Sequence, residues 1–377
     1  MGRVSAPADA RPYLLVSLSY DTKGTPVAVD RSRLLSDLER LTSAHGPSGT
    51  EAEVENLMLE MFGDLGDDIR QDDADSIVVH FRGQSKEGGI AVVAHKDEIC
   101  MIVKRVDGDG RLRVRPVGGL HPWAIGETPV EILGGTGSLP GVLSIGSKHV
   151  SAESPAAALK EGGALTWEEM WVETKLDAAS LAACGVRPGR RVVIARHRKA
   201  SWWLGEDYLC GYNLDCRAGL AMLVATAHEL AAQPPARDTW LIASSEEEIG
   251  GLGAIWSVGQ VPASTVIALD VVPVAAEYQT VNSGDPILPC QDRAGLYHAG
   301  IIEHMTQLAQ GLGFGVQTAV LTSYASDATL SKAAASATRA ALIGYAGDNT
   351  HGYEISHVDG IVNGARLLTA YLADPQP

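Results

Sequence analysis

The period of the hydrophobic positions separates helices from strands in the first hundred residues. In 31–42 the leucines recur at helical spacing, which predicts an amphipathic helix, and a second helix is predicted over 51–62. Short β-branched and apolar runs at 77–81 and 90–94 predict strands, and the second run is apolar throughout, as in a strand buried on both faces. Residues 1–28, which precede these elements, show no clear period.

The region from about 101 to 200 follows a different pattern. Turn residues at 107–110 separate two alternating segments, which predicts a β-hairpin. Further short strands are predicted over 129–133, 141–145 and 191–196. Because short strands separated by turns are typical of a small barrel or sandwich, we expect an all-β insert here.

Helices and strands alternate again after residue 200. The predicted helices are 214–232, 297–311 and 358–373, and the predicted strands are 239–244, 265–269 and 340–345. This alternation predicts an α/β architecture that the β insert interrupts.

Composition and charge narrow the range of partners. The 377 residues are enough for about two domains, and the apolar share of 45% is that of a globular protein. The net charge is −16, and an acidic surface repels phosphate backbones. We therefore expect no binding to nucleic acid.

The cysteines and the uncharged segments point to a cytoplasmic protein. The five cysteines form no C-x-x-C pair, so neither a zinc ribbon nor a disulfide framework is indicated. The uncharged segment 249–269 contains glycines and Pro262 and has acidic residues at both ends, so we do not expect it to span a membrane. The apolar run 13–18 is too short for a signal peptide.

Polar side chains follow three of the predicted strands at the point where each strand ends. His95 and Asp97 follow the strand at 90–94, Glu247 and Glu248 follow that at 239–244, and Asp270 follows that at 265–269. In open α/β sheets, ligands bind outside the carboxyl ends of the strands, so we expect these residues to converge. Two further candidates are Asp215, at the start of an apolar helix, and His351, in the loop after the strand at 340–345.

This set of residues predicts a metal centre. Crowded carboxylates repel one another unless a positive charge neutralises them. Carboxylates with histidines suit a hard-to-borderline divalent ion or a pair of such ions. Five ligands exceed the needs of one tetrahedral zinc, but they fit a bridged pair if one carboxylate, best Asp215, spans both ions.

Each candidate also has a simpler interpretation. His95 alone could be a hydrogen-bonded surface residue, although Asp97 is placed to accept its second ring N–H, as metal-bound histidines require. Asp215 could equally be a helix N-cap. The run of three glutamates could be solvated charge, whereas Asp270, between apolar runs, would be a buried charge without a partner. His351 is the weakest candidate, since another histidine lies six residues further on.

Together these motifs resemble one family. The stretches are VVAHKDEICMIV, NLDCRAG, SSEEEIGGLGA, ALDVVPV and THGYE, with GPSG near the start. They are similar to those of the dinuclear-metal aminopeptidases that assemble as tetrahedral dodecamers. That family includes glutamyl, lysyl, leucyl and deblocking aminopeptidases, some formerly called endoglucanases. The resemblance covers about residues 30 to 373.

The resemblance implies a fold and a domain division. It implies an α/β, zinc-peptidase-like catalytic domain, with a central mixed sheet flanked by helices, over 1–104 and 200–377. Residues 1–28 would be an N-terminal extension. An inserted small β-barrel over 105–199 would mediate dimerisation, and dimers would assemble into a homo-oligomeric dodecamer.

It also implies a role for each candidate. One metal would be held by His95, Asp215 and Asp270. The other would be held by Asp215, Glu248 and His351. Asp97 would orient His95, and Glu247 would be the general base. Adjacent residues on an extended strand end point to opposite sides, which would let Glu248 bind metal while Glu247 faces the water.

The implied activity is removal of N-terminal residues from short peptides that have a free N-terminus. Two divalent ions would be needed, most simply Zn²⁺, with Co²⁺ or Mn²⁺ as other choices. The alternatives are a related amide hydrolase, either a deacylase or carboxypeptidase-like, and a catalytically silent homologue. A requirement for the free amine separates the aminopeptidase from the other hydrolases.

The chain departs from the family pattern at three places. Lys96 stands where Met or a similar apolar residue is usual, and Cys216 where Asp or Asn is usual. Cys216 would either pack or make the site sensitive to oxidants. The family's Gly-Gly-Gly-Thr-Asp loop is SYASDA here, with Ser326 and Asp327 in the matching positions. Because this loop borders the substrate pocket, the preferred N-terminal residue does not follow from the resemblance.

Overall fold

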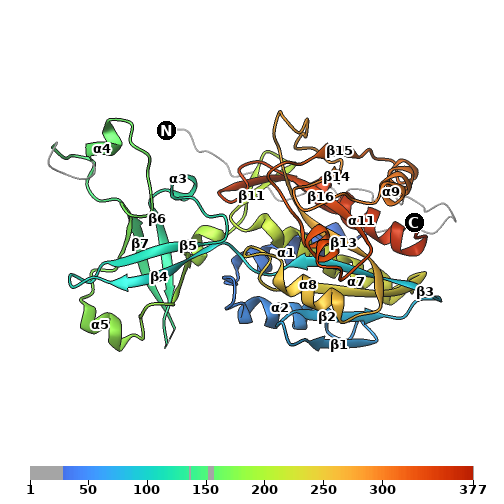
Figure 1. Ribbon diagram of the computed structural model, residues 1–377, viewed down its shortest axis with the longest axis horizontal. Coiled ribbons are helices and arrows are strands. Elements are labelled where there is room, and N and C mark those ends of the chain that lie inside the picture. Colours follow the sequence, from blue (N-terminus) through green and yellow to red (C-terminus); the bar gives the residue numbers. More distant parts are fainter. Residues whose placement is uncertain (1–28, 136, 152–156, 377) are drawn as a thin grey trace, which may run out of the picture.

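The computed structural model contains an α/β body and a β-barrel, which lie side by side in Figure 1. It describes residues 29–135, 137–151 and 157–376, so the predicted extension 1–28 lies outside the described residues. The predicted fold class, a mixed sheet flanked by helices with an inserted barrel, is confirmed.

The α/β body is built on one eight-stranded sheet. Its strands, in spatial order, are β1 (Asp68–Gln71), β2 (Ile77–Phe81), β12 (Arg237–Ser244), β3 (Ser85–His95), β13 (Ala263–Pro273), β16 (Arg339–Gly347), β14 (Ile287–Gln291) and β15 (Gln317–Val320). The four central strands, from β12 to β16, run parallel. Antiparallel pairing of β2 with β12 and of β14 with β16 makes the sheet mixed.

Helices cover both faces of this sheet. They are α1 (Arg31–Ser43), α2 (Ala52–Phe62), α7 (Leu214–Ala232), α8 (Leu252–Gly259), α9 (Ala299–Gly311), α10 (Asp327–Ala333) and α11 (Val358–Ala373). Side chains from α8 and α10 pack on one face, and side chains from α1, α2, α7, α9 and α11 pack on the other. Val92 and Val93, neighbours on β3, belong to different cores, because successive side chains of a strand point to opposite faces.

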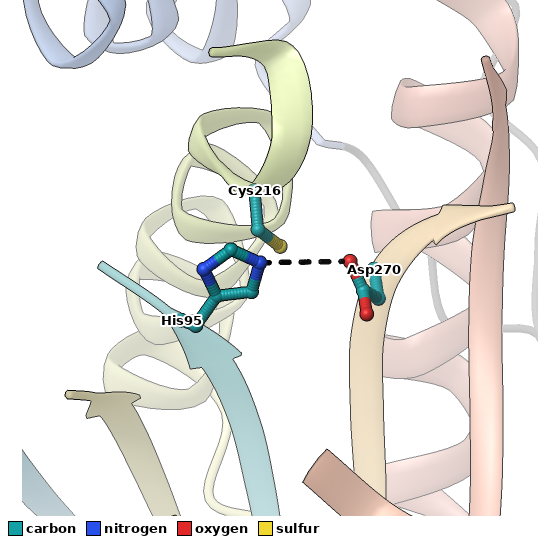
Figure 2. A group of neighbouring side chains, drawn as sticks. All are labelled: His95, Cys216 and Asp270. Carbon is teal, nitrogen blue, oxygen red and sulfur yellow. Dashed lines mark ion pairs between the residues drawn. The ribbon is translucent and has the colours of Figure 1, made fainter. Parts of the chain in front are cut away.

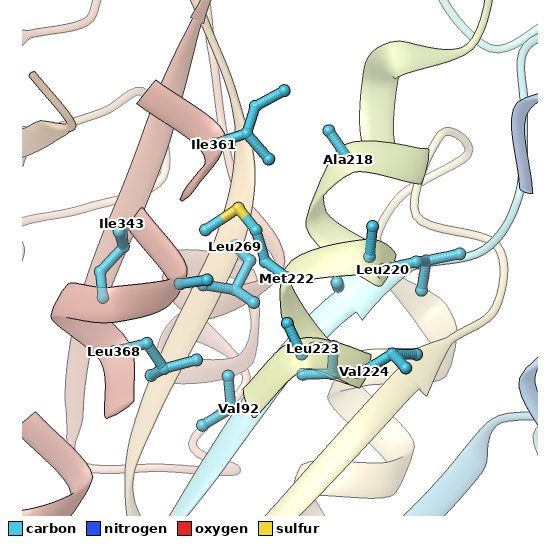
Figure 3. Packing of buried hydrophobic residues seen from close by; sticks show 14 of the residues in the cluster. Val92, Ala218, Leu220, Met222, Leu223, Val224, Leu269, Ile343, Ile361 and Leu368 are labelled. Atoms are coloured by element: carbon cyan, nitrogen blue, oxygen red, sulfur yellow. The ribbon is translucent and has the colours of Figure 1, made fainter. Parts of the chain in front are cut away.

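Helix α7 is packed into the centre of the larger core. Figure 3 shows its Met222 and Leu223 beside side chains from β3, β13, β16 and α11, including Leu269 and Leu368. Ala and Leu dominate its sequence, and both favour a helix. Burial of each leucine contributes about 1.5–3 kcal/mol. This packing fixes the start of α7, where Asp215 lies.

The barrel is closed by six short strands. They are, in order around the barrel, β4 (Cys100–Val106), β5 (Leu112–Val117), β8 (Trp171–Glu173), β7 (Ser138–Ser144), β6 (Thr128–Leu133) and β9 (Arg191–Ile194). Inward-pointing side chains such as Val103, Val130 and Val192 form a core of their own. The short helices of this region are α3 (Pro122–Ile125), α4 (Ala157–Lys160), α5 (Ala178–Ala183) and α6 (Arg196–Lys199).

A three-stranded sheet completes the fold. Its strands are β10 (Trp202–Leu204), β11 (Tyr208–Gly211) and β17 (Glu354–His357). These strands have three or four residues each, too few to show a hydrophobic period, and the sequence did not indicate them. No helix in the described part of the chain is long and apolar enough to cross a membrane.

Two local predictions need correction. Strand β13 does not end at Leu269 but continues to Pro273, so Asp270 lies inside the strand. Glu247 and Glu248 are not on an extended strand end: β12 ends at Ser244, and the glutamates occupy a turn before α8. In this turn Glu246 has a φ of 53°, in the left-handed region.

Candidate metal centre

The fold brings all five predicted metal ligands together. His95 is the last residue of β3, and Asp270 lies on the adjacent parallel strand β13. Asp215 is at the start of α7, Glu248 is in the turn between β12 and α8, and His351 is in the connection between β16 and β17. These residues come from five separate segments, so the convergence is a product of the sheet topology.

The two oxygens of Asp215 face two different histidines. Asp215 Oδ1 lies 2.9 Å from His95 Nε2, and Asp215 Oδ2 lies 3.5 Å from His351 Nε2. The backbone of Asp215 is not helical, and the side-chain contacts of Asp215 are with the two histidines. A carboxylate between two histidines has the arrangement required of a bridging ligand.

A second carboxylate completes each half of the site. Asp270 Oδ1 is 3.8 Å from His95 Nε2, and Glu248 Oε2 is 3.5 Å from His351 Nε2. The side chains of His95, Asp270 and Glu248 are 3%, 7% and 5% exposed, whereas that of His351 is 36% exposed. The half that contains His351 is therefore the more open to solvent.

Hydrogen bonds fix the orientation of both imidazole rings. His95 Nδ1 lies 3.1 Å from the backbone oxygen of Asp97 and 3.3 Å from its Oδ1. His351 Nδ1 lies 3.1 Å from the backbone oxygen of Gly119. Since a carbonyl oxygen only accepts, Nδ1 must carry a proton in each ring, so Nε2 is the atom left to bind an ion or, when it is protonated, to donate to Asp215.

The electrostatics of this arrangement fit bound cations. Burial, followed by the nearby Asp215 carboxylate, raises the pKa of Glu248 to about 8. The same two causes raise the pKa of Asp270 to about 7. Burial opposes protonation of His351, but its hydrogen bond with Asp215 and the charges of Glu248 and Asp215 raise its pKa to about 10. A divalent ion would take the place of the Nε2 proton and neutralise the clustered carboxylates. The donor set of imidazole and carboxylate suits zinc, cobalt or manganese.

Cys216 lies against the same centre. Figure 2 shows its sulfur beside His95 and Asp270, and the potential ligand atoms of the three residues all lie within 4.8 Å of one another. The Cys216 thiol donates a hydrogen bond to the backbone oxygen of Leu269 at 3.0 Å. Burial, followed by the charge of Asp270, raises the pKa of the thiol well above its usual value. A protonated, hydrogen-bonded thiol agrees with the packing alternative for this residue.

Comparison with known proteins adds the decisive observation. A family model described as M42 glutamyl aminopeptidase matches residues 75–367, which is most of the chain. The chain belongs to this family. The resemblance inferred from the motifs is thereby confirmed.

Individual M42 relatives and solved structures agree with this assignment. Lysyl aminopeptidase from Pyrococcus furiosus is 27% identical over 236 residues, which are 62% of this chain and 65% of that enzyme. The chain thus spans just under two thirds of that relative. An aminopeptidase structure from Desulfurococcus kamchatkensis superposes with a TM-score of 0.82 at 23% identity, covering 91% of this chain and 95% of that one. The TET1 peptidase of Pyrococcus horikoshii gives 0.81 at 19% identity, with coverages of 90% and 99%. These similarities show a shared fold.

Three residues that contact the centre of this M42 chain were not assigned a role by the sequence. The hydroxyl of Tyr324 donates a hydrogen bond to Asp270 Oδ2 at 2.6 Å. The carboxylate of Glu354 accepts a hydrogen bond from the N–H of Asp215 at 3.0 Å. Both lie in stretches that the family resemblance had singled out, SYASDA and THGYE. The third is Ser48, whose hydroxyl donates a hydrogen bond to Asp97 Oδ2 at 2.7 Å.

A pocket opens beside the His351 half of the centre. One wall carries Asp215, Glu248, His351 and Glu354, and the other is apolar. The apolar wall consists of Ile99, Cys100, Met101, Leu120, Ile125 and Ile194. Several of these residues belong to barrel strands, so the barrel contributes to the surroundings of the centre.

Proposed function

We propose that this M42 chain is a metal-dependent aminopeptidase that removes N-terminal residues from short peptides. The observation that carries the proposal is the placement of the two Asp215 oxygens between His95 and His351. We assign one divalent ion to His95, Asp215 and Asp270, and a second to Asp215, Glu248 and His351. Zinc is the ion that we expect, and cobalt or manganese would suit the same donors.

Bound divalent ions supply Lewis acidity, which lowers the pKa of a water and polarises a carbonyl. The protein contributes the proton transfers and the positioning. We assign the role of general base to Glu247, which would take a proton from the attacking water and pass it to the leaving amine. Asp97 would act as a positioning residue, because its two oxygens accept the N–H groups of Glu247 and Glu248 at 2.9 and 3.2 Å.

A substrate panel tests the proposal. Metal-loaded protein is given aminoacyl-anilides and their N-acetylated counterparts, and chelator-treated protein serves as the blank. We expect only the free-amine series to be cleaved, and only with metal. Cleavage of the acetylated series would favour a deacylase. No cleavage at full metal occupancy would favour a silent homologue.

We also propose that the protein assembles through its barrel. The TET1 peptidase of Pyrococcus horikoshii is described as able to form a tetrahedron or a large octahedral shell. By analogy, the β domain at 105–199 would form dimers, and dimers would build a dodecamer. Light scattering should then give a mass near twelve times the 39.7 kDa of one chain. A mass near that of a monomer would overturn the assembly without affecting the proposed chemistry.

We place the protein in the cytoplasm, acting on peptides and not on nucleic acid or membranes. All five cysteines are free thiols, which agrees with a reducing compartment. The acidic net charge agrees with the absence of nucleic acid among its partners.

A further inference from the structure

The turn that carries Glu247 is held by buried carboxylates. Three successive backbone N–H groups of this turn donate to two carboxylates. The N–H of Glu246 donates to Glu51 Oε1 at 3.3 Å. Those of Glu247 and Glu248 donate to the two oxygens of Asp97 at 2.9 and 3.2 Å. Glu51 is 4% exposed and Asp97 is fully buried. Because Glu246 has a positive φ, the turn depends on these bonds more than an ordinary turn would.

Glu51 is in turn fixed by Lys96. The Lys96 ammonium contacts Glu51 Oε2 and lies 3.0 Å from Glu55 Oε1. This leaves Glu51 Oε1 free to accept the N–H of Gly49 at 3.1 Å and that of Glu246. The two carboxylate oxygens therefore have separate tasks, one toward the lysine and one toward backbone N–H groups.

The cation is needed because of where Glu51 lies. The side chain of Lys96 is fully buried, and that of Glu51 is 2% exposed. A buried carboxylate that loses its cation is strongly unfavourable and moves or draws in solvent.

We propose that the Lys96–Glu51 pair is a positioning device that holds the turn 246–248 and thereby sets the place of Glu247. The proposal rests on the proposed function, in which Glu247 is the base. Lys96 and Glu51 contact neither the candidate ligands' side chains nor the pocket beside them. Their effect is therefore expected on the chemical step and not on substrate binding.

Two substitutions of Glu51 test its role as a hydrogen-bond acceptor for the turn. Glu51→Gln keeps one oxygen for the two N–H groups but turns its NH2 group toward the Lys96 ammonium, which retains Glu55. Glu51→Ala removes both oxygens. We expect kcat per occupied site to fall about 10–100-fold in Glu51→Ala with KM unchanged, since small displacements of a reacting group have effects of this size. Glu51→Gln should lose less activity than Glu51→Ala, because one acceptor oxygen remains. Elemental analysis gives the metal content of each protein.

A second test substitutes Lys96, the cation of the pair. Lys96→Met should slow the reaction because it leaves Glu51 without its cation. The double variant Lys96→Met/Glu51→Gln should recover most of the rate, because the amide needs no cation and still accepts. Lys86→Met, at the exposed start of the same strand, is the matched control. If Lys96→Met does not fold, the comparison of Glu51→Ala with Glu51→Gln decides alone.

Hydrogen exchange tests the device without any substrate. Amide exchange of the peptide that spans 245–251 should be faster in Glu51→Ala than in Glu51→Gln, the wild type or Lys86→Met. Equal exchange in Glu51→Ala and Glu51→Gln would overturn the proposal, as would an activity loss explained entirely by lost metal. If the wild type cleaves no peptide, the proposed function fails, and the exchange result still shows whether the pair holds the turn.

Discussion

The hydroxyl of Tyr324 donates a hydrogen bond to Asp270 Oδ2 over 2.6 Å. The other oxygen of Asp270 accepts the N–H of Val271 at 2.7 Å and faces His95. Asp270 is therefore oriented from both sides before any ion binds.

From this contact we predict that Tyr324→Phe weakens metal binding. Loss of a hydrogen bond to a ligating carboxylate typically lowers metal affinity by about 10–100-fold. Competition with a chromophoric chelator measures the affinity of each ion. We expect the affinity to fall for the ion at His95 and to change little for the other ion. An unchanged affinity for both ions would show that Asp270 is oriented by the strand alone.

Glu247→Gln should keep both metals and lose activity. The amide cannot accept a proton from water, so we expect a fall in kcat of at least ~10³. Metal content by elemental analysis should equal that of the wild type, because the ligand set is intact. Glu303→Gln, an exposed substitution on α9, is the control. Near-full activity in Glu247→Gln would remove this residue as the base.

Asp215→Asn should weaken the binding of both ions together. A neutral amide in the bridging position loses attraction to two cations at once. Calorimetric titration of the metal-free protein with Zn²⁺ should show a lower affinity at both sites than in the wild type. A shift confined to one site would make Asp215 a terminal ligand.

The candidate ligands were predictable because their signal is local. Four of the five lie beside or inside an apolar run, and the sheet topology then determines that they meet. His351 lies in a polar loop, which is why it was the weakest candidate. The turn at Glu246 was not predictable, since no residue type there signals a positive φ. Asp270 was placed at a strand end because a charge inside an apolar run indicates a boundary, whereas here Tyr324 compensates for its burial. Glu354 reaches Asp215 across 139 positions, a contact that only the packed fold defines.

The stability of the junction between α1 and the barrel should depend on pH through Glu131. Glu131 Oε1 accepts the N–H of Arg196 at 2.9 Å, and its Oε2 lies 3.1 Å from His45 Nε2. Burial alone would raise the pKa of Glu131, but hydrogen bonds from Arg196, Ser138 and His45 lower it from 4.5 to about 2. The ionised form is thus favoured by folding, so its contribution is complete above pH 4.5 and is lost as the pH falls toward 2.

We therefore expect Glu131→Gln to lower the free energy of unfolding by about 1–3 kcal/mol at pH 7. The difference from the wild type should shrink as the pH is lowered below 4.5. Urea unfolding of both proteins at a series of pH values, with the metals removed, measures it. A difference that stays constant down to pH 3 would mean that the carboxylate charge is not what stabilises the junction.

Gly119→Ala should disturb one metal and spare the other. A Cβ at Gly119 would lie 2.5 Å from His351 Nδ1, so the imidazole ring must move away and lose its hydrogen bond to the Gly119 carbonyl. His95 is held separately by Asp97, so its half of the centre keeps its ligands. We expect elemental analysis after dialysis to give close to one ion per chain in Gly119→Ala and two in the wild type. Gly108→Ala, where a Cβ meets nothing within 4 Å, is the matched control. Two tightly bound ions in Gly119→Ala would show that His351 is not needed to hold the second metal.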